Sequence, residues 1–374
     1  MILELDDLTH RYGDEFAVDG VSVGLEPGEL VAVLGPSGCG KTTIVQAIAG
    51  HVRPSGGRIR LRGVDVTDDP PENRQVGIVF QHSTLFPHLT VEENVAYGLE
   101  ARDVPPERRE ETVTRFLELV ELPDQREAYP GELSGGQKRR VELARALAPE
   151  PDVLLLDEPL SALDRSLRVG LREEIARIQS ETGVTTLLVT HDQEEAMSLA
   201  DRLVVMDDGR VAGIGPPREL YESPPTPFVS SFLGRSNALS ATVTGGPTPT
   251  IAVGGETARL PEGGEPQPVS GSVDCHVRPE DVSLSVGVTD GSGDDGDENL
   301  VDEDRTPVGD VLSLPAVVRR VADVGRRYDV TVELETGDEL VAERAARPPN
   351  RGTRVEVRIR PADVAVFDPE TDRG

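Results

Sequence analysis

A glycine-rich loop between an apolar strand and an apolar helix constrains this chain more than any other feature. Residues 30–34 are as long as a buried strand, and residues 43–49 have the composition of a helix. The residues between them follow the pattern G-x-x-x-x-G-K-[ST]. Glycines let the backbone curl so that several N–H groups converge on phosphate oxygens, and the next helix presents its positive end. The loop therefore predicts a phosphate-binding site in an α/β fold.

Each part of the loop has a separate expected task. Lys41 would reach the β- and γ-phosphates of ATP, and the Thr42 hydroxyl would bind Mg²⁺. A plain tight turn is the alternative, but the preceding strand and the following helix both favour the phosphate loop. The nucleotide-binding residues predicted here are Gly35, Pro36, Ser37, Gly38, Cys39, Gly40, Lys41, Thr42 and Thr43.

A second apolar run, residues 153–156, ends in two acidic residues, Asp157 and Glu158. A carboxylate at the end of a buried strand is costly unless it serves a charged group. Asp157 is predicted to meet Mg²⁺, and Glu158 to polarise the water that attacks the γ-phosphate. The alternative is a surface pair that caps the next helix.

Strands and helices alternate up to about residue 235. Apolar runs at 30–34, 76–80, 153–156, 186–190 and 203–206 predict strands, most of them buried on both faces. Helices are expected at 106–121 and 166–181, and Thr90 with Glu93 predicts a capping box for a helix at 91–98. Residues 1–235 are therefore predicted to form an α/β domain with a largely parallel sheet.

The pattern changes after residue 236, where alternating β segments predict a small all-β barrel over residues 236–374. Expected strands include 328–334, a return from residue 340, and 354–360. Residues 276–282 and 358–364 share Arg-Pro-x-Asp-Val, which indicates a duplication or one fold completed by two related segments. Residues 290–304 hold eight acidic residues, so a disordered acidic insert is predicted at about 288–306.

The formal net charge of -30 limits the partners of the chain. Such a surface repels polyanions, so no nucleic-acid partner is expected. Lys41 and Lys138 are the only lysines. Adaptation to high salt explains the acidic excess, whereas a GC-rich genome explains only the use of Arg over Lys. The two cysteines, Cys39 and Cys275, suggest a reducing compartment, and neither a signal peptide nor a spanning segment is expected.

A Leu-Ser-Gly-Gly-Gln segment at residues 133–137 opens a predicted helix and forms a second anion-binding helix start. With the phosphate loop before it and Asp157-Glu158 after it, the chain resembles ABC ATPases, the P-loop NTPases of ATP-binding cassette transporters. The resemblance covers residues 2 to about 235. It implies that Ser134, Gly135, Gly136 and Gln137 bind the γ-phosphate of ATP held by a second copy, in a head-to-tail dimer.

The same resemblance implies further site residues. Tyr12 matches the aromatic residue that stacks on adenine, and Gln81 matches the glutamine that contacts Mg²⁺. Asp164 belongs to the loop 161–164 at the dimer interface, and His191 matches the histidine that contacts the γ-phosphate. The predicted catalytic residues are thus Glu158, His191 and Gln81, the predicted metal residues are Thr42, Gln81 and Asp157, and the cofactors are ATP and Mg²⁺. Cys39 is interpreted as a small filler, with a reactive thiol as the alternative.

The C-terminal Arg-Pro-x-Asp-Val segments resemble the OB-type (TOBE) barrel of importer ATPases. That resemblance implies an ATP-hydrolysing subunit at the cytoplasmic face of the membrane, with permease subunits and, indirectly, a substrate-binding protein as partners. Residues 81–95 are most similar to ferric-iron and polyamine importers, and ferric iron is the predicted solute. Polyamine, thiamine, sulfate, molybdate and sugar remain alternatives.

Two other classes of function compete with an importer. A non-transport ABC ATPase would usually show zinc cysteines, a long coiled coil or two cassettes in one chain. A non-hydrolysing regulatory module would not need Glu158 and His191. The sequence therefore favours an importer ATPase.

The charge generates a prediction of its own. Because salt screens the repulsion between carboxylates, ATPase activity should rise as KCl is increased toward molar concentrations. An activity maximum in dilute buffer would contradict adaptation to high salt.

Overall fold

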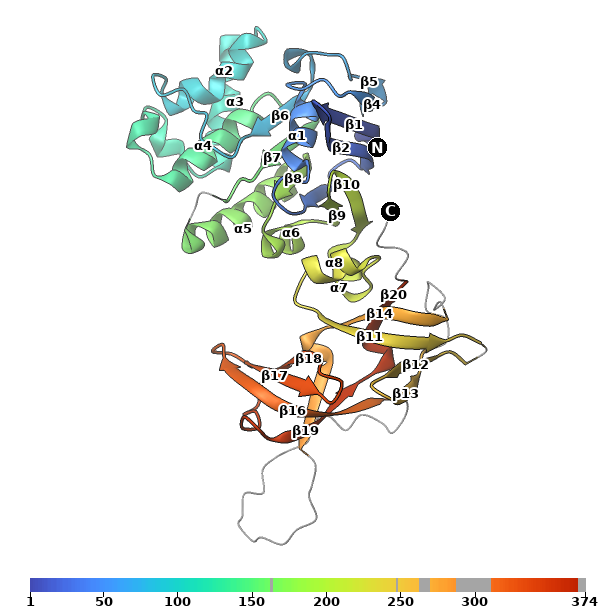
Figure 1. The fold of residues 1–374 in the computed structure, drawn as a ribbon. Helices are drawn as coiled ribbons and strands as arrows, with labels where there is room; N and C mark the ends of the chain where they lie inside the picture. Colours follow the sequence, from blue (N-terminus) through green and yellow to red (C-terminus); the bar gives the residue numbers. More distant parts are fainter. Residues whose placement is uncertain (162–163, 247, 262–269, 287–310, 369–374) are drawn as a thin grey trace. The chain divides into compact units, whose positions relative to one another are not determined.

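In the computed structural model, the five predicted apolar runs and the unpredicted strand β10 form one six-stranded sheet in the order β10-β9-β3-β8-β7-β6 (Figure 1). The structure describes residues 1–374 except 162–163, 247, 262–269, 287–310 and 369–374. Neighbouring strands are parallel apart from β10, which pairs antiparallel with β9. The strands are β3 (Leu30–Leu34), β6 (Val76–Val79), β7 (Val153–Asp157), β8 (Thr185–Thr190), β9 (Arg202–Asp207) and β10 (Arg210–Gly215).

The predicted helices are present, with ends that differ by a few residues. Thr90 caps α2 with the expected box, since its hydroxyl accepts from Glu93 N and the Glu93 carboxylate accepts from Thr90 N. The loop helix α1 begins at Lys41, two residues earlier than expected. The helices of this part are α1 (Lys41–Ala49), α2 (Val91–Ala101), α3 (Pro106–Leu119), α4 (Gly135–Leu147), α5 (Arg165–Thr182) and α6 (Gln193–Leu199).

A second sheet, which was not predicted from the sequence, packs against the same apolar core as the parallel one. It is antiparallel in the order β2-β1-β4-β5. Its leucines and valines share one apolar core with α1 and with the parallel sheet. The sheet consists of β1 (Leu3–Tyr12), β2 (Glu15–Leu25), β4 (Gly56–Leu61) and β5 (Val64–Asp65).

Backbone contacts divide the described chain into two units, Met1–Leu220 and Tyr221–Gly374. The division falls before α8 (Pro227–Phe232) and within α7 (Pro217–Glu222), whereas the sequence predicted a boundary near residue 235. The acidic insert predicted at about 288–306 lies outside the described residues, so it stays a prediction. Within the described ranges, no helix is both long and apolar enough to cross a membrane.

After α8, the described residues of the C-terminal unit form strands joined by turns, as predicted for an all-β domain. Its two five-stranded sheets have the orders β13-β12-β11-β14-β20 and β15-β19-β16-β17-β18, and their apolar side chains form one core. The first sheet contains β11 (Asn237–Thr244), β12 (Thr250–Val253), β13 (Glu256–Arg259), β14 (Gly271–Val277) and β20 (Val364–Phe367). The second contains β15 (Val282–Val286), β16 (Leu312–Asp323), β17 (Tyr328–Leu334), β18 (Glu339–Arg344) and β19 (Arg354–Ile359).

The two Arg-Pro-x-Asp-Val segments are the crossings between these sheets. The first leads from β14 to β15 through a 3-10 turn at Pro279–Asp281, and the second leads from β19 to β20 through Pro361–Asp363. Because β14 pairs with β20 and β15 pairs with β19, the segments complete one barrel from opposite directions. The shared motif thus marks two related halves of a single fold.

The arginines of the two crossings have different surroundings. Arg278 is buried, donates to the carbonyl oxygens of Ser230, Arg235 and Tyr221, and lies over the Tyr221 ring at 4.1 Å. Arg360 has a side chain that is 58% exposed, and it forms an ion pair with Asp363. Arg278 thus fastens the helical segment that precedes the barrel.

This difference predicts unequal effects on stability. Arg278→Ala should destabilise the C-terminal unit by about 2–4 kcal/mol, because three carbonyl groups, that of Ser230 buried, lose a charged donor. The matched variant Arg360→Ala should cost less than about 1 kcal/mol, as exposed ion pairs do. Urea unfolding followed by circular dichroism measures both, and equal losses would contradict this account.

Candidate functional site

The glycine loop lies at the carboxyl end of β3, between β8 and β9. Gly40 has a φ of +97°, and a Cβ there would lie 2.0 Å from the carbonyl oxygen of Ala17. Gly35 passes as closely, since a Cβ would lie 2.5 Å from the carbonyl oxygen of Met206. Glycine is therefore required at both positions for the loop to pass between the strands.

Lys41 opens α1 and is only 6% exposed. Its Nζ donates to the carbonyl oxygens of Gly35, at 2.8 Å, and of Pro36, at 2.7 Å. Cys39 lies beside it and is also buried, and burial raises the pKa of its thiol. The raised pKa favours the interpretation of Cys39 as a filler over that of a reactive thiol.

A hollow of about 400 Å³ opens in front of this loop. It brings together Tyr12 from the end of β1, the loop itself, and Glu158 from the end of β7. Gly35, Pro36 and Cys39, also predicted as nucleotide-binding, are not among its lining residues. The lining residues are Tyr12, Glu15, Phe16, Ala17, Ser37, Gly38, Gly40, Lys41, Thr42, Thr43 and Glu158.

Three of these lining residues, Glu15, Phe16 and Ala17, were missed in the sequence. They begin β2, whose first residues pair with the end of β1, so that Tyr12 lies opposite Glu15. Phe16 is 46% exposed, and the Arg11 guanidinium lies 4.0 Å from the centre of its ring. An aromatic residue just after the Gly13-Asp14 turn, four residues beyond Tyr12, was the signal available in the sequence.

Asp157 ends β7 and is 6% exposed. Burial raises the pKa of its carboxyl group, and the neighbouring Glu158 charge raises it further, while Thr42 and Lys41 act in the opposite direction. Within the described residues its Oδ1 is buried without a hydrogen-bond partner. A buried carboxylate oxygen of this kind needs a proton or a cation.

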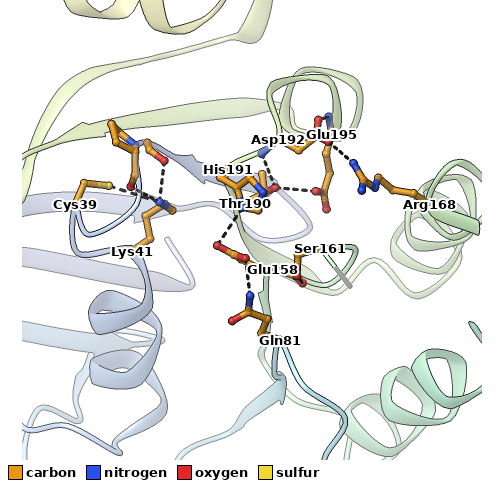
Figure 2. A network of polar contacts seen from close by, with 12 residues as sticks. Cys39, Lys41, Gln81, Glu158, Ser161, Arg168, Thr190, His191, Asp192 and Glu195 are labelled. Carbon is orange, nitrogen blue, oxygen red and sulfur yellow. Dashed lines mark hydrogen bonds and ion pairs between the residues drawn. The ribbon is translucent and has the colours of Figure 1, made fainter. Parts of the chain in front are cut away.

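Glu158 contacts the other two residues predicted to be catalytic, Gln81 and His191 (Figure 2). Its Oε2 accepts from Gln81 Nε2 at 2.9 Å, and its Oε1 lies 3.2 Å from His191 Nδ1. Its backbone has a φ of +46°, and its N–H donates to the carbonyl oxygen of Val189 at 2.8 Å. This turn places the carboxylate at the edge where β7 and β8 end, facing the hollow.

The other predicted phosphate-binding segment is not part of the hollow. Ser134 caps α4, accepting from Gln137 N, while the Gln137 side chain accepts from Ser134 N. Asp164 caps α5 in the same way, and its hydrogen bonds from Leu167 N and Ser166 lower the pKa of its carboxyl group. Gly135 and Gly136, the first residues of α4, lie outside the lining as well. A single chain therefore brings together the loop, Glu158 and His191, but not this segment.

The segment after Gln81 is held by a buried side chain that was also missed. Asn94 on α2 is fully buried, accepts from Phe86 N, and donates to the carbonyl oxygens of Phe86, Leu89 and Thr90. Phe86 and Tyr97, with ring centres 4.5 Å apart, remain near the surface beside it. The structure thus presents residues 81–95 as an ordered, partly aromatic surface.

Known families match both parts of the chain. The sequence model of the ABC transporter family matches residues 18–161, and that of the TOBE domain matches residues 275–367. One relative, the spermidine/putrescine import ATP-binding protein PotA of Acidothermus cellulolyticus, is 44% identical over 88% of this chain and 82% of its own length. The Fe(3+) ions import ATP-binding protein FbpC of Fusobacterium nucleatum is 34% identical over 99% of this chain and 94% of its own.

The chain is also similar to a sulfate/thiosulfate relative and to solved ABC structures. The sulfate/thiosulfate import ATP-binding protein CysA of Synechococcus elongatus is 40% identical over 91% of this chain and 88% of its own length. Among solved structures, cbiO1 from Clostridium perfringens has a TM-score of 0.55 and 32% identity, over 59% of this chain and 90% of that one. A dimeric post-hydrolysis ATP-binding cassette bound to ADP and Pi has a TM-score of 0.51 and 30% identity, over 57% of this chain and 98% of that one.

A substitution of Lys41 tests whether the loop binds the phosphates of ATP. Lys41→Ala should weaken ATP binding by about tenfold or more, because one charge-assisted donor is lost. Arg53→Ala removes an exposed cation just after α1 and should leave the affinity unchanged. Titration calorimetry with ATP measures both variants, and equal affinities would contradict the phosphate-binding role.

Proposed function

The chain belongs to the ATP-binding subunits of ABC importers, as the sequence predicted, and we propose that it hydrolyses ATP in the hollow beside Lys41 to drive solute uptake. The observation that carries this assignment of the site is the meeting of Glu158, Gln81 and His191 at the edge of the hollow. In this proposal the backbone N–H groups of the loop and Lys41 hold the phosphates, and Tyr12 stacks on the adenine.

Glu158 is proposed to polarise the attacking water. Its carboxylate already accepts a hydrogen bond from Gln81 and contacts the His191 imidazole, so its direction is fixed before a nucleotide enters. A fixed acceptor lowers the cost of orienting the water in the transition state. His191 is proposed to donate to the γ-phosphate, which requires its ring to turn from Glu158 toward the hollow.

The residues present fit a magnesium ion. The buried Asp157 Oδ1 has no hydrogen-bond partner in the described part of the chain, and a hard cation would satisfy it. Thr42 and Gln81 supply the hydroxyl and amide oxygens that such an ion accepts. When bound, Mg²⁺ would neutralise charge on the β- and γ-phosphates.

A second copy of the chain is proposed to complete each site. Ser134–Gln137 and Asp164 lie outside the hollow of their own chain, yet the N-terminus of α4 offers unpaired N–H groups to an anion. A solved cassette that this chain resembles is dimeric, which supports the involvement of a second copy. We propose a head-to-tail dimer in which α4 of each copy closes the hollow of the other.

The site of action is proposed to be the cytoplasmic face of the membrane, through permease partners. Residues 81–95, held by Asn94, form the proposed contact with a permease, and a substrate-binding protein acts indirectly. Ferric iron is the first solute to test, because residues 81–95 are most similar to ferric-iron and polyamine importers and a ferric-iron relative matches over 99% of this chain. The higher identity of the PotA relative favours polyamine as the second candidate.

Glu158→Gln tests the proposed reaction. The amide keeps the size of the side chain but cannot take a proton, so ATP binding should persist while turnover falls by about 100-fold or more. Phosphate release measures turnover, and light scattering should detect an ATP-bound dimer. Glu118→Gln, the same change on the exposed face of α3, should turn over normally. Hydrolysis by Glu158→Gln within about twofold of the unmodified chain would contradict the proposal.

A further inference from the structure

A buried carboxyl group lies directly behind the turn that carries His191. Glu195, on α6, is only 3% exposed, and its Oε2 accepts a hydrogen bond from Thr190 Oγ1 at 2.7 Å (Figure 2). Its Oε1 is buried and has no partner within the ranges that the structure describes. A buried carboxyl with an unsatisfied oxygen costs free energy, so packing alone does not explain its presence.

The hydrogen bonds around Glu195 enclose His191 on both sides. Thr190 ends β8, and its hydroxyl donates to Glu195 while it accepts from the backbone N–H of Asp192 at 3.0 Å. Asp192 in turn caps α6, since its Oδ1 accepts from Glu195 N at 3.1 Å. Both neighbours of His191 are therefore tied to Glu195, whereas the imidazole itself extends toward Glu158.

The charged and titratable groups that face Glu195 come from α5 and from the turn that carries His191. Arg168, from α5, pairs with Asp192 at 3.0 Å, and His191 and Asp192 come from the turn itself. The neighbouring strand β3 contributes only apolar residues, Leu30–Leu34. Burial raises the pKa of Glu195 to about 7, with a smaller contribution in the same direction from Asp192. Both protonation states are thus populated near neutral pH.

We propose that Glu195 is a positioning residue for ATP hydrolysis, which sets the direction of His191 by holding the Thr190 hydroxyl beneath the turn. The proposal rests on the role assigned to His191 above. The ionised carboxylate accepts the Thr190 proton most strongly and leaves the Thr190 lone pairs to Asp192 N–H. The protonated acid can instead donate to Thr190 Oγ1, where it competes with Asp192 N–H and loosens the turn.

Steady-state kinetics of side-chain variants test the proposal. Glu195→Ala and Thr190→Val should each lower kcat by about tenfold, the rate equivalent of one buried hydrogen bond, with KM for ATP within about threefold. The double variant should lose no more than either single variant, because both changes remove the same contact. Thr186→Val is the matched control and should keep its kcat, because this buried threonine of the same strand donates its hydroxyl to the Val184 carbonyl rather than to the turn.

The pH profile separates positioning from packing. In the unmodified chain kcat should fall as pH drops through about 7, because Glu195 takes up a proton there. Glu195→Gln still accepts from Thr190 but does not titrate, so it should keep kcat within about twofold at pH 8 and lose that part of the decline. This variant and Thr190→Val decide the question even if Glu195→Ala fails to fold.

Three results would overturn the inference: an unchanged kcat in Glu195→Ala, additive losses in the double variant, or superimposable pH profiles for Glu195→Gln and the unmodified chain. His191→Ala distinguishes the two levels of the argument. If His191→Ala lowers kcat but the Glu195 and Thr190 variants do not, the positioning role is wrong and the proposed role of His191 stands. If His191→Ala has no effect, the role of His191 itself is wrong, and the positioning role that rests on it is overturned too.

Discussion

The site depends on the register of the parallel strands. Leu34 of β3 lies beside Thr190 of β8, and Asp157 of β7 lies beside Val189. The residues that follow these pairs are Gly35, His191 and Glu158, so the phosphate loop, the histidine and the acidic pair leave the sheet at one edge. Parallel strands put their carboxyl ends together, and ligands bind where such strands end. A shift of one residue in β7 or β8 would reverse the faces of these side chains and separate Glu158 from His191.

The same register bears on the proposal that two chains are needed to complete each ATP site. The phosphate loop and Glu158 line the hollow at the carboxyl edge of the sheet, but α4 begins elsewhere, and Ser134 and Gln137 satisfy each other rather than a ligand of the same chain. The remaining N–H groups at the start of α4 are suited to an anion from outside the chain. In the proposed dimer a subunit holds half of each site, so hydrolysis would be coupled to a movement between subunits. The C-terminal barrel adds a separate unit, in which Arg278 donates to three carbonyl oxygens.

Much of this was predictable from the sequence because the signals are local. The loop, the buried runs and the capping box of Thr90 each occupy a few consecutive residues, and their chemistry requires their spacing. The antiparallel sheet was missed because β1 and β2 mix charged and apolar residues, with register shifts that break a simple alternation. Phe16, Asn94 and Glu195 were missed because their roles arise from contacts with segments distant in sequence or across a turn. Exposure identifies Phe16, full burial with four hydrogen bonds identifies Asn94, and a buried oxygen without a partner among the described residues identifies Glu195.

The central claim is that each site combines the loop of one chain with α4 of the other, and a mixing experiment tests it most directly. Lys41→Ala chains keep α4 intact, and Gly135→Asp chains keep the loop intact, so each variant alone should be inactive. A mixed dimer contains one intact site if the parts come from different chains, and none if they come from the same chain. Sharing between chains predicts that ATP hydrolysis returns when the two inactive variants are mixed. A mixture that forms dimers yet stays inactive would contradict the account.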